Sequence, residues 1–140
     1  MTQINNRIDL TSKNKSKGNN HLNTSAALMR QAIYEMELFV EFLNGKKETV
    51  NGLAGLGDLY VSSAGGRNSM MGAFIGEGMT FSEAKKNKMP NVTVEGADLA
   101  LEIGKKIKND FEDNKLPLMM SMINTICEEK PLNIEWKKFK

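Results

Sequence analysis

The sequence predicts an all-α, multi-helix domain. Apolar residues recur at intervals of three and four along several segments, which is the spacing of one face of a helix. No segment sustains the apolar–polar alternation that is typical of a half-buried strand, and no internal repeat is visible. With 140 residues, of which 40% are hydrophobic, the chain is long enough to bury one core. We therefore expect six or seven helices within residues 21–140.

Residues 1–20 differ from the rest of the chain in composition. They are rich in Asn, Lys and Ser and carry four basic side chains and one acidic one, whereas the remainder carries 15 basic and 16 acidic side chains. This polar, basic segment without periodicity predicts a flexible lead; a nucleic-acid-binding arm is the alternative. Because the remainder is nearly neutral, it lacks the basic face that a nucleic-acid partner would need, and we expect no such partner.

The first and longest predicted helix has about 20 residues and starts near residues 23–25, Asn-Thr-Ser, which can cap its first turn. Gly45 can end it. Apolar side chains spaced by four and three form its predicted stripe: Met29, Ile33, Met36, Val40 and Leu43.

A glycine-rich segment, residues 51–66, follows the long helix. Each glycine costs a helix interior roughly 1 kcal/mol relative to alanine, so we expect close backbone packing and only a short helix over residues 56–62. The next helix should begin at Arg67. Another should follow at Thr80, because Thr80 and Glu83 have the spacing of a capping box.

Two longer helices are predicted after Pro90, which interrupts the chain. The first, over residues 94–111, places four apolar side chains on one face: Ala100, Ile103, Ile107 and Phe111. The second begins at Pro117, which suits a first helical turn, and buries three side chains: Leu118, Met122 and Ile126. Residues 131–139 should form a short helix or an extended segment.

The single cysteine and single histidine exclude several kinds of site. Cys127 has no partner for an internal disulfide, and with His21 it cannot form a Cys/His zinc centre. Because Cys127 falls on an apolar helix, we expect an inert core thiol rather than a nucleophile. No stretch is apolar enough to serve as a signal peptide or to cross a membrane. We expect a cytoplasmic chain with no metal and no membrane partner.

The residues best suited to bind a ligand lie between Gly55 and Asn68. Arg67 offers a fork of donors that can grip two oxygens of a phosphate or carboxylate, and Asn68 adds an amide donor. At a helix start, unpaired backbone N–H groups also favour an anion. Asp58 and Ser62, four residues apart, would share a helix face. The pattern predicts an anion site, although an Arg-Asn pair at a helix start also serves as a cap and surface ion pair.

Several motifs together resemble one enzyme family. NTSAALMRQAIYEM, GLAGLGDL, GGRNSMMGAFIGEG, VEGADLA and LPLMMSMINTICEEKPL occur in the order found in NAD(P)-dependent glycerol-3-phosphate dehydrogenases. The resemblance covers about residues 21–140 and corresponds to the helical C-terminal, substrate-binding domain of that family. It implies a fold similar to the C-terminal domains of glycerol-3-phosphate and 6-phosphogluconate dehydrogenases. It also implies a parent reaction that interconverts sn-glycerol 3-phosphate and dihydroxyacetone phosphate with NAD or NADP.

The resemblance also implies roles for individual residues. Asp58 would lie beside the catalytic lysine and the hydroxyl end of the substrate, and Ser62 would stand near the substrate. Arg67 and Asn68 would bind the substrate phosphate, with Arg67 also near the cofactor. Two further positions match residues that contact the dinucleotide: Glu95 and, less closely, Thr93.

The chain departs from the family at its start. The family's Rossmann domain precedes these motifs, and its catalytic lysine has no match in residues 1–20, where three lysines lack the expected context: Lys13, Lys15 and Lys17. We therefore expect no catalytic residue here, no turnover and no tight cofactor binding by the chain alone. The expected partners are a small phosphate ester and either a second copy or a separate Rossmann-domain chain. The alternative is a non-catalytic helical module for dimerisation or for binding a phosphorylated metabolite.

Overall fold

The computed structural model describes residues 22–140, and this part of the chain is helical and contains no strand. The prediction of an all-α fold is confirmed. The predicted flexible lead, residues 1–20, and His21 lie outside the described residues. The elements in order are α2 (Leu22–Phe42), η1 (Lys47–Asn51), η2 (Leu53–Gly57), α3 (Asp58–Ala64), α4 (Arg67–Gly76), α5 (Phe81–Lys88), α6 (Glu95–Asp110), α7 (Pro117–Cys127) and η3 (Trp136–Lys138).

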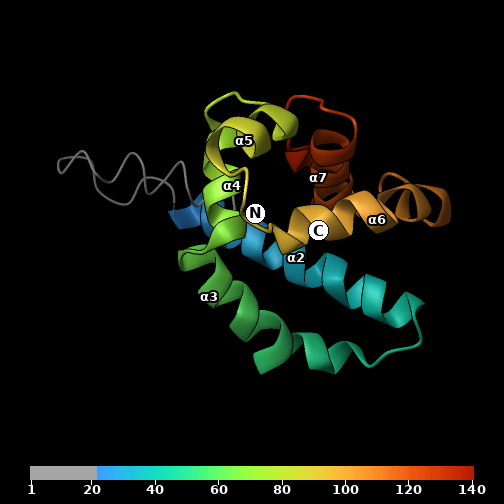
Figure 1. Ribbon diagram of the computed structural model, residues 1–140. Coiled ribbons are helices and arrows are strands. Elements are labelled where there is room, and N and C mark those ends of the chain that lie inside the picture. Colours follow the sequence, from blue (N-terminus) through green and yellow to red (C-terminus); the bar gives the residue numbers. More distant parts are fainter. Residues whose placement is uncertain (1–21) are drawn as a thin grey trace.

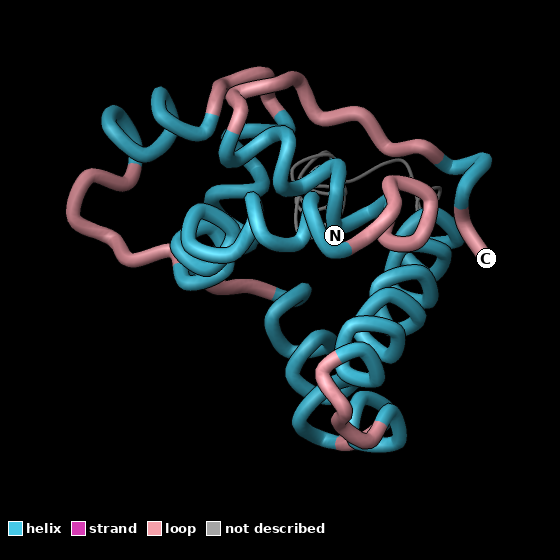
Figure 2. Tube along the Cα trace, turned by 90° about the vertical axis from the view of Figure 1, so that its right-hand side faces the viewer, coloured by secondary structure: helices cyan, strands magenta, loops and turns pink. Residues whose placement is uncertain are grey.

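The helices form two parts. In the first, α2 runs along the molecule and the chain returns beside it through η1, η2 and α3 (Figure 1). In the second, α4 to α7 pack together on the other side of α2, so that the α2–α3 arm projects from the rest when the molecule is turned (Figure 2). Gly65 and Gly66, the last two residues of the glycine-rich segment, connect α3 to α4 and so join the two parts.

The end of α2 differs from the sequence prediction. The helix stops at Phe42, and the left-handed residue that follows it is Asn44, with a φ of 60°, rather than Gly45. Asparagine tolerates this conformation better than other non-glycine residues. Gly45 instead donates its backbone N–H to the carbonyl oxygen of Val40 at 2.8 Å. The predicted capping residues at the other end, 23–25, lie inside the first turns of the helix.

α2 is covered on two sides, and the predicted stripe is only one of them. Only Ile33 of the five predicted positions is fully buried, and Leu43 is 57% exposed. The side chains that lie deepest are Leu28, Gln31, Ile33 and Glu35. Leu28, Gln31 and Glu35 share one side of the helix, and Ile33 lies on the opposite side with the half-buried Met29, Met36 and Val40. Hydrophobic spacing therefore found one covered side of α2 and missed the other, where two of the three deep side chains are polar.

Glu35 explains why polar side chains occupy the deep face of α2. Its side chain is 2% exposed, and its Oε1 and Oε2 accept the backbone N–H groups of Leu118 and Met119, each at 2.7 Å. Gln31 donates Nε2 to Glu35 Oε1 at 2.8 Å. These N–H groups belong to the first turn of α7, which has no side-chain cap of its own. Glu35 therefore caps α7 from another helix and joins the two parts of the molecule.

The glycine-rich segment packs as closely as the sequence predicts. Residues 53–57 form one π-helical turn that continues into α3, so the short helix begins at Asp58, two residues later than expected. A Cβ atom on Gly55 would lie 2.1 Å from the carbonyl oxygen of Val50, which is backbone and cannot rotate away. Gly55 is therefore required for η1 and η2 to meet.

The core of the second part consists of two apolar clusters. Phe81, Met89 and Val94 belong to the cluster around α4, α5 and α6, and Leu116 and Ile123 belong to the cluster between α6 and α7. The predicted capping box is present, because Thr80 accepts the N–H of Glu83 and Glu83 accepts the N–H of Thr80. The predicted starts of α4 at Arg67 and of α7 at Pro117 are also confirmed.

Cys127 packs against both clusters, in the surroundings expected of an unreactive core thiol. Its Sγ donates to the carbonyl oxygen of Ala100 at 3.2 Å, and burial raises the pKa of the thiol. A raised pKa keeps the sulfur protonated and poorly nucleophilic. None of the helices in the described part of the chain is both long enough and apolar enough to span a membrane.

Candidate functional site

The α3 side of the candidate site carries Asp58 and Ser62. Asp58 is the first residue of α3 and is exposed, and Ser62 lies one turn later and is half-buried. Ser62 Oγ donates to Asp58 Oδ2 at 3.5 Å, which is a long hydrogen bond. The two side chains therefore share a face, as their spacing predicts, and this weak contact leaves the Asp58 carboxylate open to another donor.

Two glycines carry the chain from α3 to α4. Gly66 has a φ of 106°, a conformation that side chains rarely adopt, and it is the N-cap residue of α4. Because glycine has no side chain, no side-chain hydrogen bond caps the first turn of α4. The start of α4 therefore has backbone N–H groups without a side-chain cap, beside Arg67 and Asn68.

Arg67 and Asn68 both contact the start of α6. Arg67 Nη2 forms an ion pair with Glu95 Oε1. Asn68 Oδ1 accepts the backbone N–H of Gly96 at 3.1 Å. The α6 N-cap, Val94, makes no side-chain cap, so Asn68 takes that role. Arg67 therefore contacts Glu95, and Asn68 contacts Gly96.

Gly96 allows this close approach. A Cβ atom at position 96 would lie 3.1 Å from Asn68 Oδ1 and 3.5 Å from its Nδ2. The 3.1 Å contact is tighter than usual, so a side chain here would shift the amide by a few tenths of an ångström, whereas the 3.5 Å contact is ordinary. With the carbonyl oxygen of Asn68 bound to Gly96, its Nδ2 is the end that can donate to a ligand.

Sequence reasoning missed Ser69, which fixes the position of α4 against α3. Its side chain is 2% exposed, and Ser69 Oγ donates to the carbonyl oxygen of Ser62 at 2.7 Å. This bond holds the first turn of α4 against the last turn of α3. A serine within a Met-rich apolar run was the only signal in the sequence.

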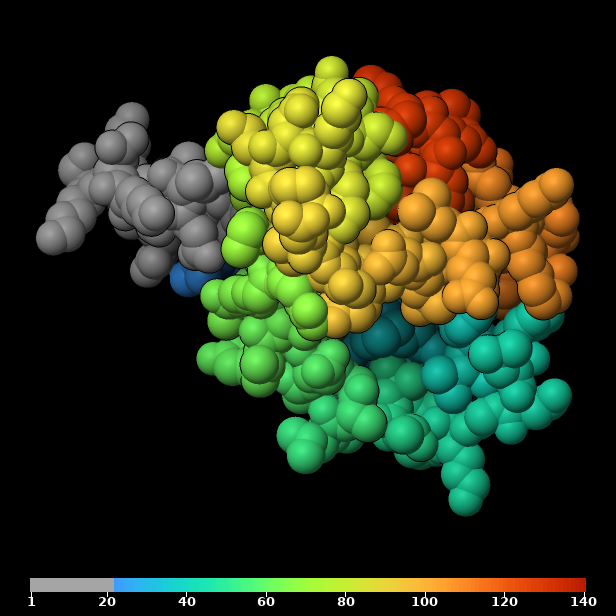
Figure 3. All heavy atoms as spheres, viewed as in Figure 1, coloured from blue at the N-terminus to red at the C-terminus, as the bar shows by residue number. Residues whose placement is uncertain are grey.

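The structure brings together some of the predicted site residues but not all of them. Arg67, Asn68 and Glu95 lie at one junction, and exposed Thr93 lies two residues before Glu95. No hydrogen bond or ion pair joins Asp58 to Arg67 or Asn68 in the described structure. In the space-filling view, a hollow separates α6 from α3, with α2 at its floor (Figure 3).

This arrangement can hold an anion but supplies no metal centre. Arg67 and Asn68 Nδ2 are donors, and the side chains of Arg67 and Glu95 are 52% and 56% exposed, so both are accessible to a solute. Within residues 22–140, no group of three or more His, Cys, Asp or Glu side chains could hold a metal ion.

Comparison with known sequences gives one consistent match. Residues 15–136 match the family described as "NAD-dependent glycerol-3-phosphate dehydrogenase C-terminus". The chain is 37% identical over 93 residues to the NADP(+)-dependent glycerol-3-phosphate dehydrogenase of Archaeoglobus fulgidus, which covers 63% of this chain and 28% of that enzyme. It is 35% identical over 112 residues to the glycerol-3-phosphate dehydrogenase [NAD(P)+] of Agathobacter rectalis, covering 78% of this chain and 32% of that enzyme.

A eukaryotic relative gives a similar match. The glycerol-3-phosphate dehydrogenase [NAD(+)], cytoplasmic, of Drosophila melanogaster is 34% identical over 108 residues, which cover 75% of this chain and 30% of that enzyme. The chain thus spans about a third of the length of the curated relatives it matches. No solved structure matches it significantly.

Proposed function

Because the chain belongs to the NAD-dependent glycerol-3-phosphate dehydrogenase family, matched at the C-terminal domain, we propose that it supplies the substrate-binding part of such a dehydrogenase. The parent reaction would interconvert sn-glycerol 3-phosphate and dihydroxyacetone phosphate. The observation that carries this proposal is the placement of Arg67 and Asn68 side by side at the start of α4, where no side chain caps the helix.

Each site residue has a proposed role that its position supports. Arg67 would grip the substrate phosphate with charge-assisted hydrogen bonds, and Asn68 Nδ2 would donate to the same group. Asp58, across the α3–α4 junction, would accept from the hydroxyl end of the substrate, with Ser62 beside it. The catalytic lysine expected from the resemblance lies outside this set, and residues 1–20 lie outside the described structure.

The residues near α6 fit one edge of a dinucleotide. Arg67 is a half-exposed cation suited to a pyrophosphate, and Glu95 is a half-exposed carboxylate that can accept sugar hydroxyls. Thr93, exposed in the loop before α6, can add a hydroxyl. A bound nicotinamide would supply the hydride chemistry. These residues would orient only one end of the cofactor, so its tight binding requires other contacts.

Binding of the phosphate ester by the chain alone tests the proposed site. We expect sn-glycerol 3-phosphate to bind with a millimolar-range affinity in an NMR titration, with the largest shifts at the amides of residues 66–69. Arg67→Ala should weaken binding at least tenfold, since a hydrogen bond to a charged group is worth about 1.5–3 kcal/mol.

Arg30→Ala is the matched control for the loss of one cation. Arg30 lies on α2, 5.5 Å from the ring centre of Tyr34, and is exposed. This variant should bind the ester as the wild type does. Equal binding by all three proteins would overturn the proposed site.

An exposed apolar strip supports the proposal of a partner. Four side chains of η2 and α3 form this strip, with exposed fractions from 42% to 88%: Leu53, Leu56, Tyr60 and Val61. A group of exposed apolar side chains supports an interface at this surface. Because the matched relatives are about three times as long as their matched segment, we propose that a dinucleotide-binding domain covers the strip.

Self-association is the expected behaviour of the strip when no other domain covers it. Sedimentation equilibrium of the purified chain should give an apparent mass that rises with concentration. The double variant Leu53→Lys/Val61→Lys should be monomeric with unchanged helix content. Leu101→Lys, which alters a 52% exposed leucine on α6, should associate like the wild type. A wild-type chain that stays monomeric at every concentration would contradict this interface.

The cytoplasmic location expected from the sequence remains a prediction. The Drosophila melanogaster relative carries that location in its name.

A further inference from the structure

The ion pair between Arg67 and Glu95 has a consequence for anion binding at the proposed site. Arg67 is the main donor that we assign to the substrate phosphate, yet its Nη2 is engaged by a carboxylate from the start of α6. We propose that Glu95 is an internal counter-ion of Arg67 in the unliganded chain and that it opposes the binding of an anion to this guanidinium. This inference rests on the proposed function, because it assumes that Arg67 is the anion donor.

The chemistry of the guanidinium explains why the two anions compete. Arginine grips an oxyanion in bidentate fashion through either of two forks, Nε with Nη2 or Nη1 with Nη2. Nη2 takes part in both. Nη2 carries two N–H groups, one for each fork, so a phosphate can use the fork that Glu95 leaves open, but it then brings a second negative group onto the nitrogen that Glu95 already contacts.

The neighbouring contact differs in kind. Asn68 meets Gly96 through its carbonyl oxygen, so this bond uses an acceptor and orients Nδ2 as a donor. Arg67 meets Glu95 through a donor nitrogen, so that bond uses the group an anion needs. The start of α6 therefore orients the Asn68 amide for an anion through Gly96, and it competes with the anion for Arg67 through Glu95.

The exposure of the pair makes displacement feasible. The two side chains are 52% and 56% exposed, and exposed ion pairs are weak because water screens them. Removing the competing carboxylate should therefore tighten anion binding only modestly, by about two- to five-fold. The gain should shrink at higher ionic strength, which screens exposed charges.

The test compares charge-neutral replacements of two glutamates on α6. Glu95→Gln keeps the shape of the side chain but removes its charge, and Glu102→Gln removes one charge from an exposed position further along the same helix. Each protein is titrated with inorganic phosphate and with sn-glycerol 3-phosphate at low salt, followed by NMR. Glu95→Gln should bind both ligands about two- to five-fold more tightly than the wild type, and Glu102→Gln should match the wild type.

The outcomes separate this inference from the proposed function. If binding by the wild type does not depend on Arg67, as judged with Arg67→Ala, the proposed anion site is wrong. If binding depends on Arg67 but Glu95→Gln binds equally or more weakly, the counter-ion role is wrong and Glu95 supports the site. If Glu102→Gln tightens binding as much as Glu95→Gln, the effect comes from net charge, and the local competition is also wrong.

Discussion

Replacing Glu35 by alanine is expected to destabilise the chain strongly. The buried carboxylate accepts two backbone N–H groups at the start of α7 and the amide of Gln31. Alanine would leave those donors buried without partners, at about 1–3 kcal/mol each. We expect a total loss of roughly 3–5 kcal/mol. The midpoint of thermal unfolding, followed by circular dichroism, should fall by about 10–20 °C.

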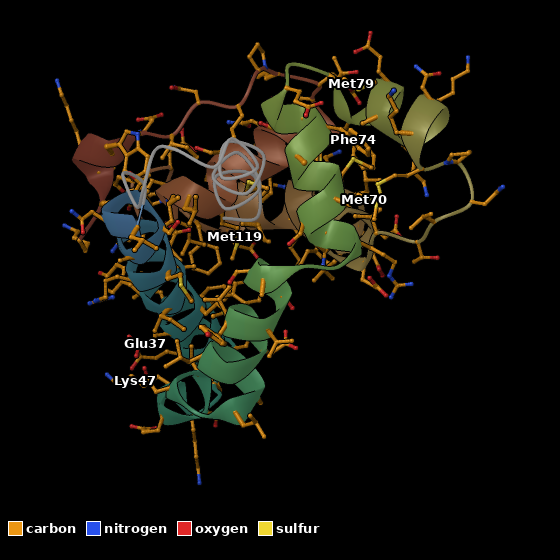
Figure 4. All side chains as sticks on the ribbon, turned by 90° about the vertical axis from the view of Figure 1, so that its left-hand side faces the viewer. Glu37, Lys47, Met70, Phe74, Met79 and Met119 are labelled. Carbon is orange, nitrogen blue, oxygen red and sulfur yellow. The ribbon has the colours of Figure 1, made fainter. Side chains whose placement is uncertain are left out.

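Two companion variants make the result specific. Glu35→Gln keeps one acceptor oxygen and should lose about 1 kcal/mol, because one backbone N–H loses its acceptor. Glu41→Ala removes an exposed carboxylate of α2 that lies 3.9 Å from Lys47, and it should change stability by less than about 0.5 kcal/mol. Lys47 lies beyond the end of α2, away from Met119 (Figure 4). If Glu35→Ala lowers the free energy of unfolding no more than Glu41→Ala does, Glu35 does not cap α7.

The cap should also respond to pH. Burial raises the pKa of Glu35 above its ordinary value of 4.5, against the opposing effect of the three hydrogen bonds. The stability linked to its protonation is therefore complete below about pH 4.5 and is lost as the pH rises through the raised pKa. The wild type should gain stability relative to Glu35→Gln as the pH falls through that window, in urea unfolding at several pH values.

Replacing Gly55 by alanine should have the second largest effect. A Cβ atom there would lie 2.1 Å from the Val50 carbonyl oxygen and 2.7 Å from its carbonyl carbon. Because these are backbone atoms, the π-helical turn and η1 would have to separate. We expect a loss of roughly 3 kcal/mol, at the upper end of the cost of overpacking. Urea unfolding would measure it, and sn-glycerol 3-phosphate binding should weaken because this turn positions Asp58.

Gly65→Ala is the matched control in the same segment. Its φ of 172° is extended, and no atom lies within 4 Å of the position that its Cβ would occupy. Alanine should therefore be tolerated, with stability unchanged or slightly raised because the unfolded chain loses freedom. If the two alanine variants unfold at the same urea concentration, the close approach of η1 and η2 is not what holds the segment.

The elements that were predicted well have local causes. Pro117 begins α7 because a proline suits a first helical turn, and Thr80 with Glu83 caps α5 because the two side chains reach each other's backbone N–H. Arg67 begins α4 because Gly66 takes a positive φ just before it. In each case the residues that decide the structure are within a few positions of one another.

The elements that were predicted less well depend on partners distant in the chain. Hydrophobic spacing missed the second covered side of α2, because Glu35 is buried there to cap a helix that begins 82 residues later, at Pro117. Ser69 was overlooked because its partner is the backbone of Ser62 in another helix. The contacts of Arg67 and Asn68 with residues 95 and 96 were likewise invisible, since nothing local indicates that α4 and α6 begin side by side.

The amino-acid sequence by itself determined that this protein is helical, where most of its helices begin, and which family it resembles, because helix periodicity, caps and motifs are encoded over short distances. Only the tertiary structure decided that a glutamate of α2 caps α7 and that Glu95 engages the guanidinium of Arg67. Such contacts form when folding brings distant helix ends together, so no local pattern records them.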